Sequence, residues 1–136
     1  MKVRNGFVSN SSSSSFLIYG VHGQYPLTDE AKKIIYEKND EYKSKSYEEF
    51  LDSIDDYDFD VDESLYTVSE KLNIDKDLES ISMGYGDDDY IGISWSRVKD
   101  DETSLQFKNR VKENIRKVYE VEDEEFNTFE EAWFDG

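Results

Sequence analysis

The sequence predicts an α+β domain in which a small antiparallel sheet carries helices on one face. Short segments alternate apolar with small residues, and longer segments begin with capping residues and repeat apolar residues every three or four positions. The predicted strands lie near residues 16–21, 80–86 and 90–96, and the predicted helices near residues 28–44, 47–55 and 104–118. A chain of 136 residues suits one such domain, residues 16–136, preceded by a serine-rich segment, residues 1–15.

Two of the predicted strands have the period-two pattern of a half-buried sheet. Their apolar residues alternate with Gly or Ser, and are Ile81, Met83, Tyr85, Ile91, Ile93 and Trp95. If both sets face one core, antiparallel pairing places Tyr85 opposite Ile91, Met83 opposite Ile93 and Ile81 opposite Trp95. That register makes residues 87–89 a hairpin loop. The run at residues 16–21 is apolar throughout, which favours a central strand.

Each predicted helix starts at a residue that can cap it. Thr28 precedes the first helix, and capping boxes begin at Ser46 for the second and at Thr103 for the third. The third helix has a buried stripe, which consists of Phe107, Val111, Ile115 and Val118. It also carries five basic residues, whose most economical role is in salt bridges to neighbouring acids.

Two more capping boxes predict short helical segments. One begins at Thr67 and predicts a helix that ends near Asn73, and the other begins at Thr128 and predicts a last turn that carries Trp133. Residues 56–62 alternate Asp with apolar residues, which is the period of a half-buried strand. Because Asp is a poor strand former, we expect an edge strand or an extended loop there.

The charge of the chain is strongly negative and uneven. The net charge is −17, although residues 1–26 contain two basic residues and no acid, so the remaining residues carry −19. Such a field repels nucleic acid and anionic membranes and attracts cationic surfaces, whereas the alternative is that it serves solubility alone. The chain has no Cys, no visible secretory signal and no apolar run long enough to span a membrane. We therefore expect a cytoplasmic protein.

The predicted partner-binding residues are surface carboxylates. They are Asp56, Asp58, Asp60, Asp62, Asp87, Asp88 and Asp89. Spaced carboxylates can replace phosphates as partners of Arg and Lys, so this surface is typical of a protein that occupies a cationic, nucleic-acid-binding groove. The alternative is a carboxylate-based metal-binding module or a metal-dependent enzyme. However, the segment from Asp56 does not match an EF-hand loop. The position that requires Gly is occupied by Val61, and the position of the final Glu is occupied by Thr67.

No catalytic residue, cofactor or metal site is predicted. The single histidine, His22, follows an apolar run and is expected to be structural or exposed. The function that the residues favour is therefore a non-enzymatic interaction protein that binds a basic protein, and neither nucleic acid nor membrane.

Residues 4–16 read RNGFVSNSSSSSF. This opening resembles that of many small proteins of bacteriophages and Firmicutes, and weaker similarity extends to residues 95–96, 100–103, 107–108 and 131–136. The resemblance implies a phage or prophage setting, with a host protein as partner in the host cytoplasm, and it implies no activity or site residue.

The serine run also prompts a separate hypothesis, because it lies between Phe7 and Phe16. Residues 4–15 would form an ordered loop whose amides and hydroxyl groups bind an anion or a partner. The residues assigned to this loop are Arg4, Asn10, Ser11, Ser12 and Ser13. The alternative is a flexible tail.

Overall fold

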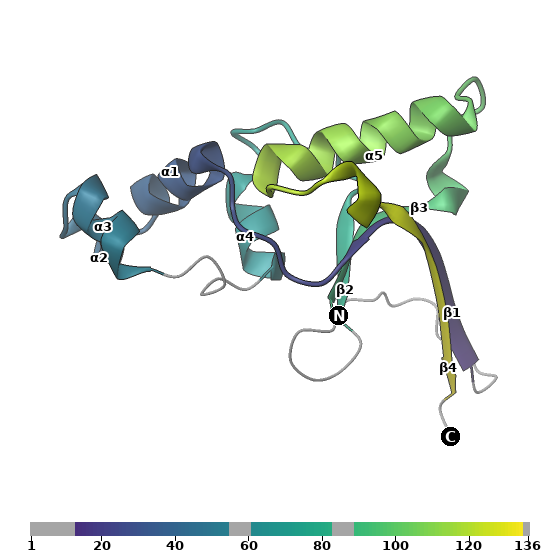
Figure 1. The fold of residues 1–136 in the computed structure, drawn as a ribbon, viewed down its shortest axis with the longest axis horizontal. Coiled ribbons are helices and arrows are strands. Elements are labelled where there is room, and N and C mark those ends of the chain that lie inside the picture. Colours follow the sequence, from purple (N-terminus) through teal and green to yellow (C-terminus); the bar gives the residue numbers. More distant parts are fainter. Residues whose placement is uncertain (1–12, 55–60, 83–88, 135–136) are drawn as a thin grey trace.

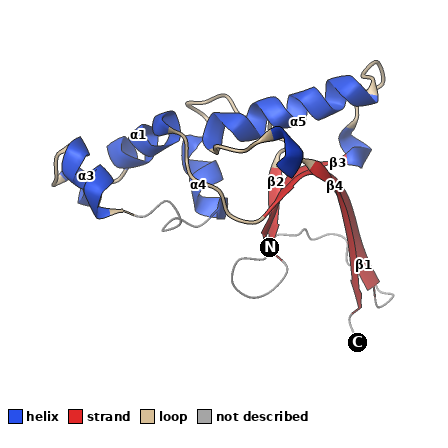
Figure 2. Ribbon diagram, viewed as in Figure 1, coloured by secondary structure: helices blue, strands red, loops and turns tan. Residues whose placement is uncertain are grey.

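The computed structural model describes residues 13–54, 61–82 and 89–134. It confirms an α+β fold, in which an antiparallel sheet with the strand order β2-β3-β1-β4 carries helices (Figures 1 and 2). The strands are β1 (Ser13–His22), β2 (Glu79–Ser82), β3 (Asp89–Ser94) and β4 (Asn127–Phe134). The helices are α1 (Asp29–Lys38), α2 (Asp40–Lys43), α3 (Tyr47–Ser53), α4 (Val61–Val68) and α5 (Ser104–Val118). Two short 3-10 turns are η1 (Trp95–Arg97) and η2 (Asp123–Glu125).

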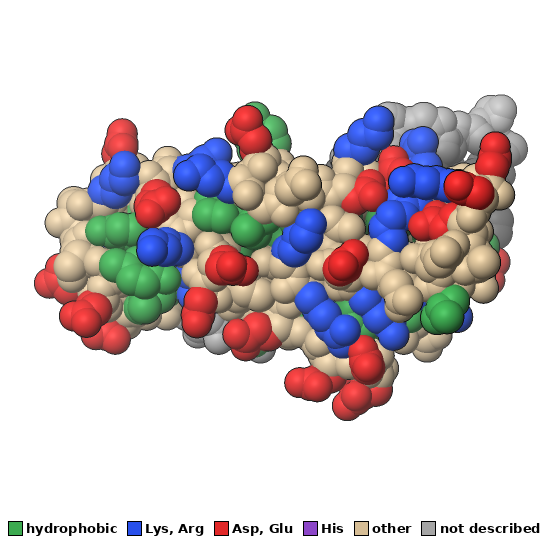
Figure 3. Space-filling model, turned by 90° about the horizontal axis from the view of Figure 1, so that it is seen from above, with side chains coloured by type: hydrophobic (Ala, Val, Ile, Leu, Met, Phe, Trp, Pro, Cys, Tyr) green, Lys and Arg blue, Asp and Glu red, His purple; other side chains and the backbone are tan. Residues whose placement is uncertain are grey.

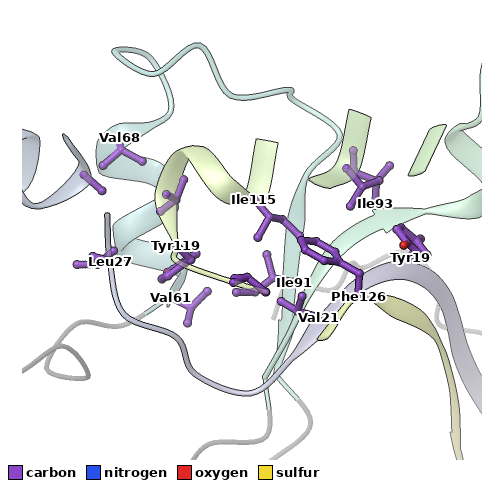
Figure 4. Packing of buried hydrophobic residues seen from close by; sticks show 14 of the residues in the cluster. Tyr19, Val21, Leu27, Val61, Val68, Ile91, Ile93, Ile115, Tyr119 and Phe126 are labelled. Atoms are coloured by element: carbon purple, nitrogen blue, oxygen red, sulfur yellow. The ribbon is translucent and has the colours of Figure 1, made fainter. Parts of the chain in front are cut away.

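The helices form a layer above the sheet that extends beyond it on one side. Helix α5 lies along the top of the sheet, α4 lies below its C-terminal half, and α1 to α3 project to the side (Figure 2). The main core lies where these elements meet, as Figure 4 shows for residues of β1, β3, α4 and α5. Strands β1 and β4 continue past this core as a curved two-stranded ribbon (Figure 1).

Helix α5 has the bounds that its sequence predicts. The Thr103 hydroxyl accepts a hydrogen bond from the Gln106 amide at 3.1 Å, and the Gln106 side chain accepts one from the Thr103 amide at 2.8 Å. The predicted stripe of Phe107, Val111, Ile115 and Val118 is fully buried. The capping box and the apolar stripe thus indicate the same helix, which explains why the sequence pattern was sufficient to predict the bounds of α5.

The helix predicted at residues 28–44 is interrupted. Asn39 has extended backbone angles, φ −118° and ψ 113°, and its side chain accepts a hydrogen bond from the Glu41 amide at 2.9 Å. Asn39 therefore ends α1 and caps α2, because its short side chain offers the backbone an alternative to the helical hydrogen bond. The helix predicted at residues 47–55 is α3, which ends two residues earlier, at Ser53.

The predictions for residues 61–73 were wrong. Val61 and Asp62 belong to α4 rather than to an extended segment, and α4 ends at Val68, where the Thr67 capping box predicted a helix to begin. Asn73 has a positive φ of 56° and belongs to a turn. Val61 and Val68 lie seven residues apart and are both buried in the main core. Tertiary burial of this face therefore prevailed over the local capping signal.

The predicted register of β2 and β3 was also wrong. Ile81 pairs with Tyr90 rather than with Trp95, and Ser80 pairs with Ile91. Ile81 consequently faces the opposite side of the sheet from Ile91, where it packs in a second cluster. This second cluster consists of Ile18, Ile81 and Tyr90, with Phe129 packed against it. The prediction failed because it assumed a single buried face, whereas apolar residues are buried on both faces of this sheet.

The C-terminal prediction failed for a related reason. Residues 127–134 form strand β4 rather than a capped turn at Thr128, and β4 pairs with β1 from Gly20 opposite Asn127 to Ser13 opposite Phe134. Strand β1 thus begins at Ser13, three residues before the predicted strand. Long-range pairing with β1 decided the structure of this segment, and no local pattern reports such a partner.

Two glycines allow the central strands to approach each other closely. Gly20 and Gly92 are register partners in β1 and β3. A Cβ atom on Gly20 would overlap the Ile91 carbonyl oxygen, and one on Gly92 would overlap the Tyr19 carbonyl oxygen. The close contact of β1 and β3 beneath α5 therefore requires glycine at both positions.

Candidate functional site

Most of the predicted site residues lie outside the described part of the chain. These are Arg4, Asn10, Ser11, Ser12, Asp56, Asp58, Asp60, Asp87 and Asp88. Of the others, Ser13 is the first residue of β1, Asp62 lies in α4, and Asp89 is the first residue of β3. The Asp89 carbonyl accepts a hydrogen bond from the Gly23 amide at 2.9 Å. The grouping of these carboxylates into one surface stays a prediction.

Among the basic residues of α5, Arg110 is engaged by carboxylates of its own chain. Its guanidinium binds both oxygens of Glu102, at 2.8 and 2.9 Å, and donates to Asp75 at 3.0 Å. It also donates to the Arg97 carbonyl at 3.0 Å and lies 3.7 Å from an Asp77 oxygen. The pKa of Glu102 is lowered to about 2, chiefly by its hydrogen bonds to Arg110. This ion cluster links the loop after η1 and the turn before β2 to α5.

The C-terminal half of α5 is neutralised in the same way. Arg116 forms a salt bridge with Asp123, and the Lys112 ammonium lies 3.8 Å from the same carboxylate. The hydrogen bond from Arg116 is the main reason why the pKa of Asp123 lies below its ordinary value. Lys117 donates to the Asn73 carbonyl at 3.0 Å. The expectation of salt bridges to neighbouring acids is therefore confirmed for Arg110, Lys112 and Arg116. Lys117 bonds a carbonyl instead, and the Lys108 ammonium lies over the Tyr19 ring at 5.5 Å.

A run of exposed acidic residues follows α5 directly. It consists of Glu120, Glu122, Asp123, Glu124 and Glu125, and we refer to it as the acidic turn. All five residues are exposed. Glu120, Glu122 and Glu124 form no ion pair with any described residue. The run of acids is visible in the sequence, but only the structure shows that this segment is ordered and lies beside α5.

Three contacts hold the acidic turn against the body of the protein. The Glu120 amide donates to the Pro26 carbonyl at 2.9 Å, and Leu27 and Tyr119 form an isolated β-bridge. The Tyr25 hydroxyl donates to a Glu125 carboxylate oxygen at 3.0 Å. Burial and this hydrogen bond raise the pKa of Tyr25 to about 12. The acidic turn is therefore held in a defined position against the rest of the protein.

On the helical face of the molecule the charges are mixed. On the face of the molecule that Figure 3 shows from above, acidic and basic side chains alternate over the helices. A surface of mixed sign gives a cationic partner no extended area of attraction. The acidic turn, in contrast, lies in residues 119–131, a segment without Lys or Arg.

His22 occupies a structural position, as expected. Its ring stacks on Tyr90 with 4.2 Å between centroids and 11° between planes, and it meets Phe129 edge-on at 5.9 Å. The residue is exposed at the end of β1. Stacking of this kind stabilises the second cluster of the sheet and assigns His22 no chemical role.

A second candidate site, which sequence patterns do not reveal, is a cleft between α1 and α4. Its volume is about 410 Å³, and both Ile35 of α1 and Ser64 of α4 lie at its wall. Ser64 is 3% exposed, and its hydroxyl group has no hydrogen-bond partner among the described residues. Glu63 and Glu70 also line the cleft, as does Lys38.

Neither site has the ligands of a metal centre. Among the described residues there is no group of three or more His, Asp or Glu side chains that could hold a metal ion. In the same part of the chain, no helix is both long and apolar enough to cross a bilayer. No family model, curated protein or solved structure matches this chain.

Proposed function

We propose that this protein is a non-enzymatic interaction protein that binds a cationic site on another protein through its acidic surface. The partner class is a basic protein whose cationic site otherwise binds nucleic acid, and the phage-like opening of the chain favours a protein of the host cell. The acidic turn carries the proposal, because its five carboxylates are exposed and only Asp123 is paired with cations of the described chain.

The arrangement of charges supports this choice over general solubility. A protein that only needs solubility gains most from charges spread over its surface, whereas here the helical layer mixes both signs (Figure 3). Of the cations of α5, Arg110 is held by Glu102 and Lys117 by the Asn73 carbonyl, and the ion pairs of Lys112 and Arg116 with the acidic turn are made to Asp123. Carboxylates at Glu120, Glu122 and Glu124 are thus left to pair with Arg and Lys of a partner.

The test is an affinity capture from bacterial lysate at 50 and 500 mM salt, followed by titration of each captured protein in purified form. We expect a basic protein that is held at low salt and released at high salt, since screening weakens exposed ion pairs. Duplex DNA should compete with this protein for the partner, because both would occupy the same cationic site.

Two variants with the same change in net charge locate the contact. In the first, Gln replaces Glu120, Glu122 and Glu124 of the acidic turn. In the second, the matched control, three exposed acids of α1 and α3 are replaced, by Glu37→Gln, Glu48→Gln and Asp52→Asn. We expect the first variant to lower the affinity by about tenfold or more and the control to change it much less. Equal losses in both variants, or capture that is indifferent to salt, would overturn the proposal.

A further inference from the structure

The cleft between α1 and α4 lies where α1 ends. Asn39 leaves the helical conformation and caps α2, and both Asn39 and Lys38 of the last turn of α1 line the cleft. Helix α4 and the turn after it form the opposite wall, from Glu63 to Glu70. The volume of about 410 Å³ is within the range of sites for small organic molecules and far exceeds what a single ion needs.

The buried Ser64 hydroxyl indicates that this cleft receives a polar group. A buried hydroxyl without a hydrogen bond costs about 1–3 kcal/mol, so such groups are normally paired in native structures. Ser64 is 3% exposed, lines the cleft and has no partner among the described residues. Its oxygen is therefore available to accept a hydrogen bond from a ligand in the cleft.

The charge of the cleft favours a cationic ligand. Its charged lining residues are Glu63, Glu70 and Lys38, all exposed at the rim, so their net charge is negative. The C-terminal turn of α1 borders the cleft, and α4 ends within its wall at Val68. Helix C-termini carry partial negative charge on their free carbonyl groups, which adds to the attraction for a cation.

The remaining lining suits the hydrocarbon part of such a ligand. Ile35 is buried at the wall, and the rings of Tyr42 and Tyr66 border the opening. Tyr66 is 84% exposed, so its ring faces solvent and does not pack in the core, which is unusual for an aromatic residue. Aromatic rings bind both methylene groups and ammonium groups, the latter by cation–π attraction.

We propose that this cleft binds a small aliphatic amine of the diamine or polyamine class. One ammonium group donates to the Ser64 hydroxyl, and the Glu63 and Glu70 carboxylates neutralise the ligand. The methylene chain packs on Ile35 and the tyrosine rings. This site is separate from the acidic turn, and it does not depend on the proposed protein partner.

The experiment is a calorimetric titration of the full chain with spermidine and with putrescine, at 150 mM salt. The control ligand is 1,4-butanediol, which has the carbon skeleton of putrescine and no charge. Amide NMR spectra recorded during the titration locate the ligand, and we expect the largest shifts at residues 35–42 and 63–70. Binding of the diol as strongly as the diamine would overturn the proposal.

Variants of the protein distinguish binding at this cleft from a general attraction of amines to an acidic protein. We expect Glu70→Gln and Ser64→Ala each to weaken spermidine binding by about fivefold to tenfold, since each removes a hydrogen-bond acceptor of the ammonium group. Lys38→Met should strengthen binding, because it removes the one cation of the lining. Glu113→Gln, a matched charge change at an exposed residue of α5 outside both the cleft and the acidic turn, should have almost no effect.

Two further results would overturn the inference. The first is equal binding by the Glu70→Gln, Ser64→Ala and Glu113→Gln variants, which would mean that spermidine binding depends only on the net charge of the protein. The second is a lower melting temperature of ligand-free Ser64→Ala, which would show that the hydroxyl already has a stabilising partner within the protein. An unchanged or higher melting temperature supports the proposal.

Discussion

The substitution Arg110→Met tests whether the ion cluster of α5 stabilises the fold. Arg110 holds Glu102 through two hydrogen bonds and Asp75 through a third, and its side chain is 12% exposed. Met keeps an apolar stem of similar length and removes the charge, together with the guanidinium group that lies over the Phe107 ring at 5.4 Å. The variant leaves the carboxylates of Glu102, Asp75 and Asp77 together without their common cation.

The expected loss of stability follows from the burial of these groups. Removal of one partner from a buried ion pair costs about 3–5 kcal/mol. The three carboxylates are 10%, 19% and 20% exposed, so water can partly relieve their repulsion, and we expect a loss of about 2–3 kcal/mol. The lowered pKa of Glu102, about 2 instead of 4.5, arises from the same contact and corresponds to at most about 3 kcal/mol before solvent screening reduces it.

The assay is urea unfolding of the parent, Arg110→Met and Arg110→Lys proteins at pH 7 and pH 3. Because folding lowers the pKa of Glu102, its contribution is complete above about pH 4.5 and is lost as the pH falls towards 2. The difference between the parent and Arg110→Met should therefore shrink at pH 3. Lys keeps the charge but cannot form the paired hydrogen bonds to Glu102, so its loss should be intermediate, about 1 kcal/mol.

Two results would contradict this reasoning. A free energy of unfolding for Arg110→Met within about 0.5 kcal/mol of the parent at pH 7 would mean that the desolvation cost of the cluster cancels its attraction. A difference between the two proteins that is the same at pH 7 and pH 3 would show that packing, rather than the ionised carboxylates, accounts for the loss.

Three further predictions concern the sheet, the charge and metal ions. Gly20→Ala places a Cβ atom against the Ile91 carbonyl oxygen, so we expect a loss of more than about 2 kcal/mol in urea unfolding, and a neutral effect would refute the close approach of β1 and β3. Moderate salt should raise the melting temperature, because it screens the repulsion that a net charge of −17 produces, whereas a flat response would show that the acids are paired locally. Calorimetric titration with Ca²⁺, Mg²⁺ and Mn²⁺ should give no heat of binding, and these ions should not change the melting temperature. Saturable heat at micromolar metal would instead support the alternative function, a carboxylate-based metal-binding module.

The candidate sites were only partly accessible to sequence reasoning. The acidic run at Glu120–Glu125 can be read directly from the sequence, but only the structure shows that Arg116 and Lys112 pair with Asp123 and not with Glu120, Glu122 or Glu124. The cleft could not be foreseen, because the sequence does not show that α4 begins at Val61 and packs beside α1. That Ser64 is buried without a partner among the described residues is a property of that packing alone.

The sequence by itself determined the elements whose signals are local. Helix α5 combines a capping box at Thr103 with a regular apolar stripe, and both signals act within a few residues of each other. The starts of α1 at Thr28 and of α3 at Ser46 follow from the same chemistry. The surplus of negative charge is likewise a property of composition and needs no fold.

Only the tertiary structure decided which face of the sheet each apolar residue occupies and which segments pair. Period-two alternation shows that Ile81 and Ile91 each point to one side of a strand, but not that the two sides are opposite. Residues 127–134 form a strand because they pair with β1, in spite of the capping box at Thr128. Such choices depend on contacts between residues far apart in the chain, whose free energy exceeds that of the local signals they override.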